Sequence, residues 1–139
     1  MIPYLFVYAS LRAGFHSPAY EYITRFFQPA GEAFVKGKFF FTGKTPVAIS
    51  SDEDVIEGDL YKLKDLHDFS WAFSQLDDYE GLNVEEGEVP LYKRELVTVT
   101  SSNLSVSAWI YWYNRNTEGL PAIPASEISG LLQQMKKAD

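Results

Sequence analysis

The chain has 139 residues, a formal net charge of −7 and no cysteine. The length fits a single domain, residues 1–139, that can bury a core without cross-links. The acidic balance argues against nucleic acid as a partner, because Lys and Arg must neutralise phosphates there. The absence of cysteine excludes a thiol nucleophile and a zinc–thiolate site, and it fits a reducing, cytoplasmic compartment. No apolar run is long enough to span a membrane, and no secretory signal is expected at the N-terminus.

The first elements are a strand and a helix. The apolar run at residues 4–8 predicts a short buried strand. Ser17 followed by Pro18 is typical of a helix start, since the hydroxyl caps the first turn and Pro suits its first position. Helical spacing then gives one apolar face, and Pro29 is expected to end the helix. That face comprises Tyr22, Ile23, Phe26 and Phe27.

Strand patterns dominate the next thirty residues. Residues 31–41 predict a strand, residues 44–46 a turn, and residues 47–49 a short strand. The acidic residues 52–54 are expected to form a solvated turn. Alternation of apolar and polar side chains over residues 55–63 predicts a half-buried strand.

The second half adds a helix, a hairpin and a terminal helix. Residues 65–79 carry helical spacing, and Gly81 is a plausible C-terminal stop. Residues 91–100 and 106–113 predict a hairpin, and residues 126–137 a short helix. The expected class is α+β: a small, mixed, mostly antiparallel β-barrel flanked by two or three helices.

Two segments could carry chemistry. Residues 8–14 leave the first strand just before a helix, where backbone N–H groups can converge on an anion. Residues 75–81 hold three carboxylates at a helix end, and helical spacing places Asp77 and Glu80 on one side. Negative charge there opposes the helix dipole. Taken alone, either segment is an ordinary turn. The isolated His16 and His67 predict no metal site.

Five short motifs in order resemble the γ-glutamylcyclotransferase-like family, which includes avirulence-induced-gene-like proteins and γ-glutamylamine cyclotransferases. Residues 8–14 (YASLRAG) resemble its YGSLRxG signature, with Ala9 in place of the glycine. Residues 76–81 (LDDYEG) resemble its LDxYEG segment. Residues 58–61 (GDLY), 91–94 (LYKR) and 108–111 (AWIY) resemble three strand motifs of the family.

The resemblance implies both a site and a partner. Glu80 falls on the family's catalytic glutamate, acting as general acid and base. The expected partner is a small-molecule γ-glutamyl substrate, with no cofactor and no metal. The substrate-binding residues implied by the resemblance are Tyr8, Ala9, Ser10, Leu11, Tyr92 and Tyr111.

The implied reaction requires no Ser or Cys nucleophile. The α-amine of a γ-glutamyl group attacks its own γ-carbonyl and gives 5-oxoproline plus an amine or amino acid. One alternative is a relative of the same fold that binds a small molecule without catalysis, with Ala9 as the residue that marks its divergence from the family motif. A second is glycoside cleavage by Asp77 or Asp78 with Glu80, beside the aromatic residues 109–113. Adjacent acids on one helix end rarely face each other across a cleft, which disfavours the second alternative.

Overall fold

The computed structural model describes residues 1–9, 18–82 and 84–138. The strands are β1 (Tyr4–Val7), β2 (Phe27–Phe41), β3 (Pro46–Leu63), β4 (Tyr92–Ser101), β5 (Leu104–Tyr113) and β6 (Ala122–Ile123). The helices are α1 (Pro18–Phe26), α2 (Phe69–Tyr79) and α3 (Ile128–Ala138). Single 3₁₀ turns, η3 (Leu66–Asp68) and η4 (Ala125–Glu127), precede α2 and α3.

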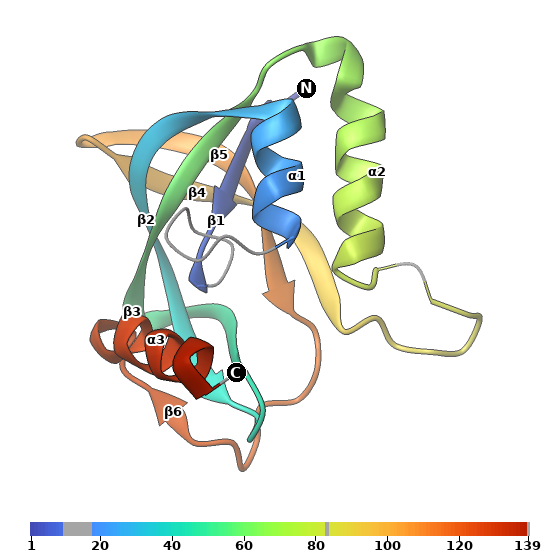
Figure 1. The fold of residues 1–139 in the computed structure, drawn as a ribbon. Coiled ribbons are helices and arrows are strands. Elements are labelled where there is room, and N and C mark those ends of the chain that lie inside the picture. Colours follow the sequence, from blue (N-terminus) through green and yellow to red (C-terminus); the bar gives the residue numbers. More distant parts are fainter. Residues whose placement is uncertain (10–17, 83, 139) are drawn as a thin grey trace.

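The strands form one curved sheet in the order β3-β1-β5-β4-β2-β6. Among the described strands, every pairing is antiparallel except that of β1 with β5. The sheet curves strongly, because β2 also pairs with β3 along most of its length (Figure 1). The predicted α+β class with a mixed, mostly antiparallel sheet is therefore confirmed, whereas its closure into a barrel stays a prediction.

The predicted first strand is buried on both faces. Phe6 packs into the cluster inside the curved sheet, together with Ile110 and Trp112. Leu5 and Val7 point to the opposite face and join the cluster beneath α1 and α2. The period of two along a strand accounts for this division, and explains why β1 reads as a continuous apolar run.

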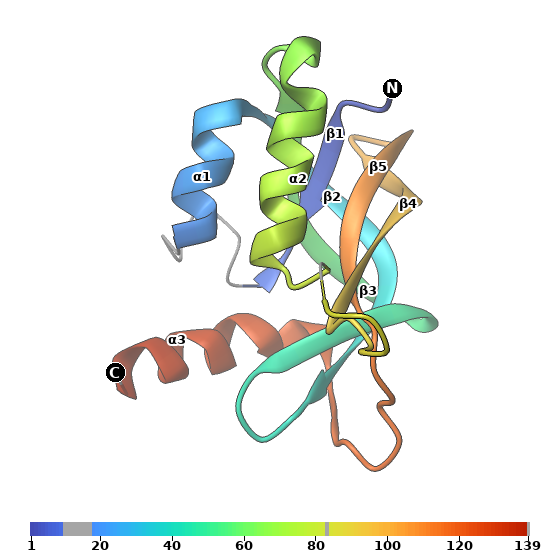
Figure 2. The same cartoon turned by 90° about the vertical axis from the view of Figure 1, so that its right-hand side faces the viewer.

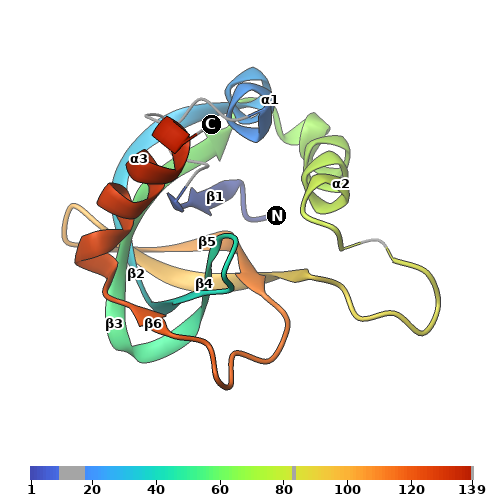
Figure 3. The same ribbon diagram turned by 60° about the horizontal axis from the view of Figure 1, so that its bottom comes forward.

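The helices lie on two sides of the sheet. α1 and α2 lie side by side, whereas α3 lies near the far end of β2 and β3 (Figure 2). Figure 3 shows α3 on the opposite side of the molecule from α2. In the part of the chain that the structure describes, no helix is both long and apolar enough to cross a membrane.

Gly58 lets β3 pass close to β1. A Cβ placed on Gly58 would lie 2.2 Å from the carbonyl oxygen of Val7 and 2.5 Å from the ring of Phe6. Because the nearest atom belongs to the backbone, a side-chain rotation cannot relieve this contact. The glycine is therefore a packing requirement of the β1–β3 pair.

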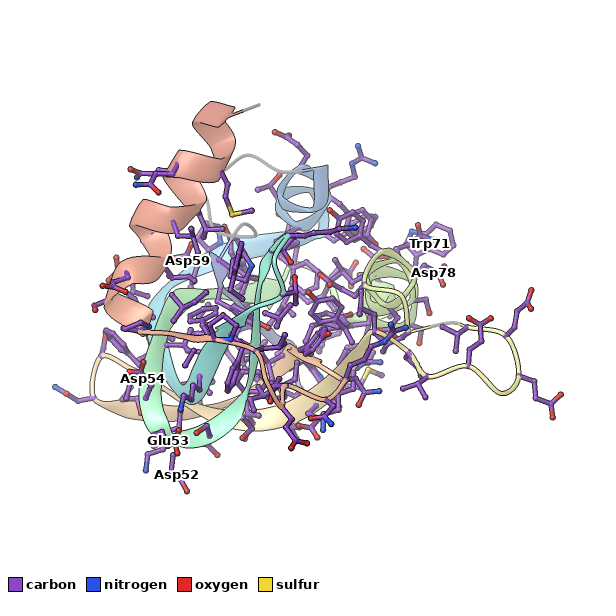
Figure 4. The ribbon with its side chains drawn as sticks, turned by 90° about the horizontal axis from the view of Figure 1, so that it is seen from below. Asp52, Glu53, Asp54, Asp59, Trp71 and Asp78 are labelled. Carbon is purple, nitrogen blue, oxygen red and sulfur yellow. The ribbon has the colours of Figure 1, made fainter. Side chains whose placement is uncertain are left out.

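The expected acidic turn at residues 52–54 is wrong, because β3 is one strand from Pro46 to Leu63. Its register against β2 shifts there: Gly37 pairs with Ser50, whereas Lys36 pairs with Val55. The four residues between Ser50 and Val55 form a bulge, and Figure 4 shows the side chains of Asp52 and Glu53 at this bend. Lysines of β2 compensate the acidic charges, since Lys36 lies near Asp52 and Lys38 pairs with Glu53.

Two other boundaries differ from the sequence predictions. Phe27, expected on the first helix, begins β2 and packs edge-on against Phe73 of α2. Tertiary packing thus overrides the helical spacing at this position. The sequence predicts no element between residues 113 and 126, but β6 forms there and pairs with β2.

The remaining expected elements are present. The turn between β4 and β5 has two residues, Ser102 and Asn103, both with positive φ (50° and 65°). This geometry matches the twist of a tight hairpin. Gly81 has φ of +77° directly after the residue that caps α2, as expected of a helix stop.

Candidate active site

A cavity of about 470 Å³ opens where β1 and α2 end, β4 begins and β5 approaches its end. Tyr8 and Ala9 follow β1, Glu80 follows α2, Tyr92 begins β4, and Tyr111 lies in β5. All five line the cavity. The segments are far apart in the sequence, so the fold of the sheet brings them together.

Among the described residues that line the cavity, Glu80 is the acidic one. It forms the C-cap of α2, and its backbone N–H bonds to the carbonyl of Leu76, so the helix end fixes its position. Burial of the carboxyl raises its pKa from 4.5 to about 7. A carboxyl with a pKa near neutrality can both accept and return a proton.

The tyrosines around Glu80 remain protonated at neutral pH. Burial, together with the nearby charge of Glu80, raises the pKa of Tyr92 to about 12. Burial also raises the pKa values of Tyr8 and Tyr111. The Tyr8 hydroxyl donates a hydrogen bond to the backbone carbonyl of Tyr111, which ties the loop after β1 to β5. Glu80 thus lies among neutral phenols.

A network behind the cavity holds the last turn of α2. The Tyr111 hydroxyl donates to Asp77 Oδ1 at 2.6 Å, and Arg94 bonds both oxygens of Asp77 at 2.9 and 3.2 Å. The guanidinium lies 4.6 Å from the centre of the Trp109 ring and 5.0 Å from that of Phe73. Asp77 therefore fixes α2 against β4 and β5, one turn before Glu80. Sequence reasoning considered Asp77 as an acidic neighbour of Glu80 and as a carboxylate of the glycosidase alternative, and missed its pairing with Arg94.

Ala9 occupies a backbone conformation that favours glycine. Its φ is +55°, in the left-handed region, and it is one of three non-glycine residues with positive φ in the described chain. An L-residue there costs about 1–2 kcal/mol relative to the right-handed region. The chain after β1 thus keeps a glycine-like geometry at Ala9, and this alanine is one of the residues that line the cavity.

A second wall of the cavity is apolar and comes from elsewhere in the chain. Pro46 and Val47 at the start of β3 contribute to it, with Thr45 before them. Leu132 and Met135 of α3 complete it. These residues form no part of the motifs that carry the resemblance.

The acidic bulge of β3 holds the start of this terminal segment. Asp54 Oδ2 accepts a hydrogen bond of 3.0 Å from the backbone N–H of Ala125, the first residue of η4. Ala125 and Ile128 pack against the cluster inside the sheet. One residue of the bulge therefore positions the helix that supplies Leu132 and Met135.

Most of the predicted site residues meet in this cavity. The predicted Ser10 and Leu11 lie outside the described residues, as does Arg12. Asp77 and Asp78, the carboxylates of the glycosidase alternative, do not line the cavity. Asp78 lies on the outer side of α2, as does Trp71 (Figure 4). No group of three or more His, Asp and Glu residues able to hold a metal ion occurs within residues 1–9, 18–82 and 84–138.

Comparison with known proteins decides the family. The family described as γ-glutamyl cyclotransferase, AIG2-like, matches residues 5–129. The chain belongs to that family. The match of this AIG2-like chain begins within β1 and ends at the start of α3. No curated protein matches the chain.

Solved structures share the fold of this AIG2-like protein. The uncharacterized protein PH0828 from Pyrococcus horikoshii is 18% identical, with a TM-score of 0.63 and 97% of each chain covered. The protein ytfP from Escherichia coli is 23% identical, with a TM-score of 0.58 and coverage of 88% and 93%. A structure titled as a γ-glutamyl cyclotransferase is 13% identical, with a TM-score of 0.54 and coverage of 97% and 78%. At these identities the likeness is one of fold.

Proposed function

We propose that this chain is a γ-glutamyl cyclotransferase that releases 5-oxoproline and an amine or amino acid from a γ-glutamyl substrate. The observation that carries the proposal is the position of Glu80. Its carboxyl has a pKa near neutrality and lies in the same cavity as Tyr8 and Ala9. Family membership over residues 5–129 supports the same reaction type.

The reaction needs no external nucleophile and no water. The α-nitrogen of the substrate attacks the γ-carbonyl carbon, a C–N bond forms, and the C–N bond to the leaving amine breaks. A cavity that holds the substrate folded makes this attack unimolecular, for which effective molarities are large. The Tyr8–Tyr111 hydrogen bond supports this role by fixing the loop after β1 against β5.

Glu80 moves one proton in two steps. Its carboxylate removes a proton from the α-ammonium, which frees the nitrogen to attack. The resulting carboxylic acid then donates that proton to the leaving nitrogen. The attacking nitrogen loses a second proton as the lactam forms, and the released amine takes it up and departs as an ammonium ion, so hydrogen atoms and charge balance. The Tyr92 hydroxyl, protonated because its pKa is about 12, is our candidate donor to the γ-carbonyl oxygen as negative charge develops there. In this proposal the backbone of the loop after β1, including Ser10 and Leu11, binds the α-carboxylate.

The test is formation of 5-oxoproline from a panel of γ-glutamyl amines and γ-glutamyl amino acids. We expect kcat/KM to increase as pH rises through about 7, because the ionised Glu80 starts the reaction. Glu80→Gln, which keeps the shape and removes the base, should lower kcat by at least about 100-fold. Asp78→Asn, which removes a charge from the outer side of α2, is the matched control and should retain activity.

A non-catalytic binding relative is the second candidate, and Ala9 favours it. Ala9 lines the cavity at the position where the family motif has a glycine, so the alanine adds a methyl group there. If that methyl prevents the folded substrate from forming, γ-glutamyl compounds bind to the wild type without yielding 5-oxoproline. Ala9→Gly then restores turnover, and calorimetric binding measured beside the product assay separates the two functions.

A further inference from the structure

The cavity has a reactive half and an apolar half. Glu80 and the tyrosines lie at the ends of α2, β1 and β4, whereas Pro46, Val47, Leu132 and Met135 come from β3 and α3. A γ-glutamyl group at Glu80 would occupy the reactive half. The amine portion that leaves can then lie against the apolar half.

The described residues of the apolar half provide no counter-charge for a charged leaving group. Val47 and Leu132 are buried, at 3% and 8% exposure, so they offer hydrocarbon surface to a bound group. None of the cavity-lining residues that the structure describes is Lys, Arg or His. Lys44 precedes Thr45 in the chain, but it is exposed and outside the lining. A carboxylate or ammonium placed against this wall loses hydration without gaining a partner.

Resting on the proposed function, we propose that the natural substrates are γ-glutamyl amides of neutral, apolar primary amines. Pro46 and Val47 of β3, with Leu132 and Met135 of α3, form the subsite for the alkyl or aryl part of the amine. Peptides with further carboxylates and polyamine conjugates are poor substrates. The products are 5-oxoproline and the free apolar amine, with the same atoms as the substrate.

The sharpest test compares two substrates of the same shape. γ-Glutamyl-n-pentylamide and γ-glutamylputrescine differ by a terminal methyl against an ammonium group. We expect kcat/KM to be at least tenfold higher for the pentylamide. In a series of methyl, propyl and pentyl amides, kcat/KM should rise about fourfold for each methylene that reaches the wall.

A charge placed in the wall should change the preference. Met135→Glu puts a carboxylate in the apolar half and should raise kcat/KM for γ-glutamylputrescine while lowering it for the pentylamide. Gln134→Glu adds the same charge one residue earlier on α3, at an exposed position outside the lining, and should leave the ratio unchanged. Inhibition of the wild type by n-pentylamine and by 1,4-diaminobutane gives a readout that needs no variant. The pentylamine should inhibit at least tenfold more strongly.

The outcomes separate the two proposals. Equal or faster turnover of γ-glutamylputrescine, or stronger inhibition by the diamine, overturns the apolar subsite and leaves the cyclotransferase function in place. Absence of 5-oxoproline from every substrate overturns the cyclotransferase function, and the inference with it. A preference for the pentylamide that Met135→Glu reverses and Gln134→Glu does not supports both.

Discussion

Replacing Glu80 by Gln should make the folded protein more stable above pH 7, even though it removes the proposed base. Burial raises the pKa of the Glu80 carboxyl from 4.5 to about 7, so the folded chain favours the neutral acid. The unfolded chain ionises near pH 4.5, and between the two pKa values the folded state binds more protons. Stability therefore falls as pH rises from about 4.5 to about 7. The neutral amide of Gln has no such dependence.

The size of the effect follows from the two pKa values. Their difference is about 2.5, and each pKa unit corresponds to about 1.4 kcal/mol, which gives about 3 kcal/mol above pH 7. Urea unfolding of the wild type and Glu80→Gln at pH 5 and pH 8 measures it. The difference in unfolding free energy should shift by about 2–3 kcal/mol in favour of the variant between these pH values. If the difference in unfolding free energy between the two proteins does not change with pH, the carboxyl of Glu80 is not held neutral by burial. Asp78→Asn controls for the change in net charge.

Three further predictions test the scaffold of the site. Gly58→Ala should cost at least about 3 kcal/mol of unfolding free energy, because its Cβ would lie 2.2 Å from a backbone oxygen. Gly130→Ala is the matched control: Gly130 lies in α3 with open space around it, and the change should stabilise the protein by about 0.5–1 kcal/mol. Ala9→Gly should raise stability by about 0.5 kcal/mol, since relief of the positive φ exceeds the entropy cost of glycine; a loss in urea unfolding would contradict the strain. Arg94→Met should cost about 2 kcal/mol, because it removes both bonds to the partly buried Asp77. A double-mutant cycle with Asp77→Asn should give a coupling of at least about 1 kcal/mol, and additivity would show that the pair is not coupled.

The sequence is informative where local chemistry decides the structure. Residues 4–8, the helix before Gly81 and the hairpin around Ser102 all have periods or turn residues that specify one local geometry. The bulge in β3 could not be found this way, because acidic residues at 52–54 look like any solvated turn. Their partners, Lys36, Lys38 and Ala125, are distant in the sequence.

The candidate site was likewise predictable from the sequence only in part. The resemblance selected Glu80, Tyr8, Tyr92 and Tyr111, and the fold brings them into one cavity, although their roles stay predictions. No sequence pattern indicated the apolar half of the cavity, since Leu132 and Met135 look like the ordinary apolar face of an amphipathic helix.

The link between Asp54 and Ala125 gives the molecule a modular character. The proposed chemistry depends on the ends of β1, α2 and β4, whereas the surface proposed to meet the leaving amine comes partly from the start of β3 and partly from α3, a helix held at its start by the bulge. Exchange of α3 for a helix of different polarity would alter the apolar half of the cavity, while β1, α2, β4 and β5 would still position the reactive half. Substrate range and chemical step can thus be redesigned, or diverge, independently of each other.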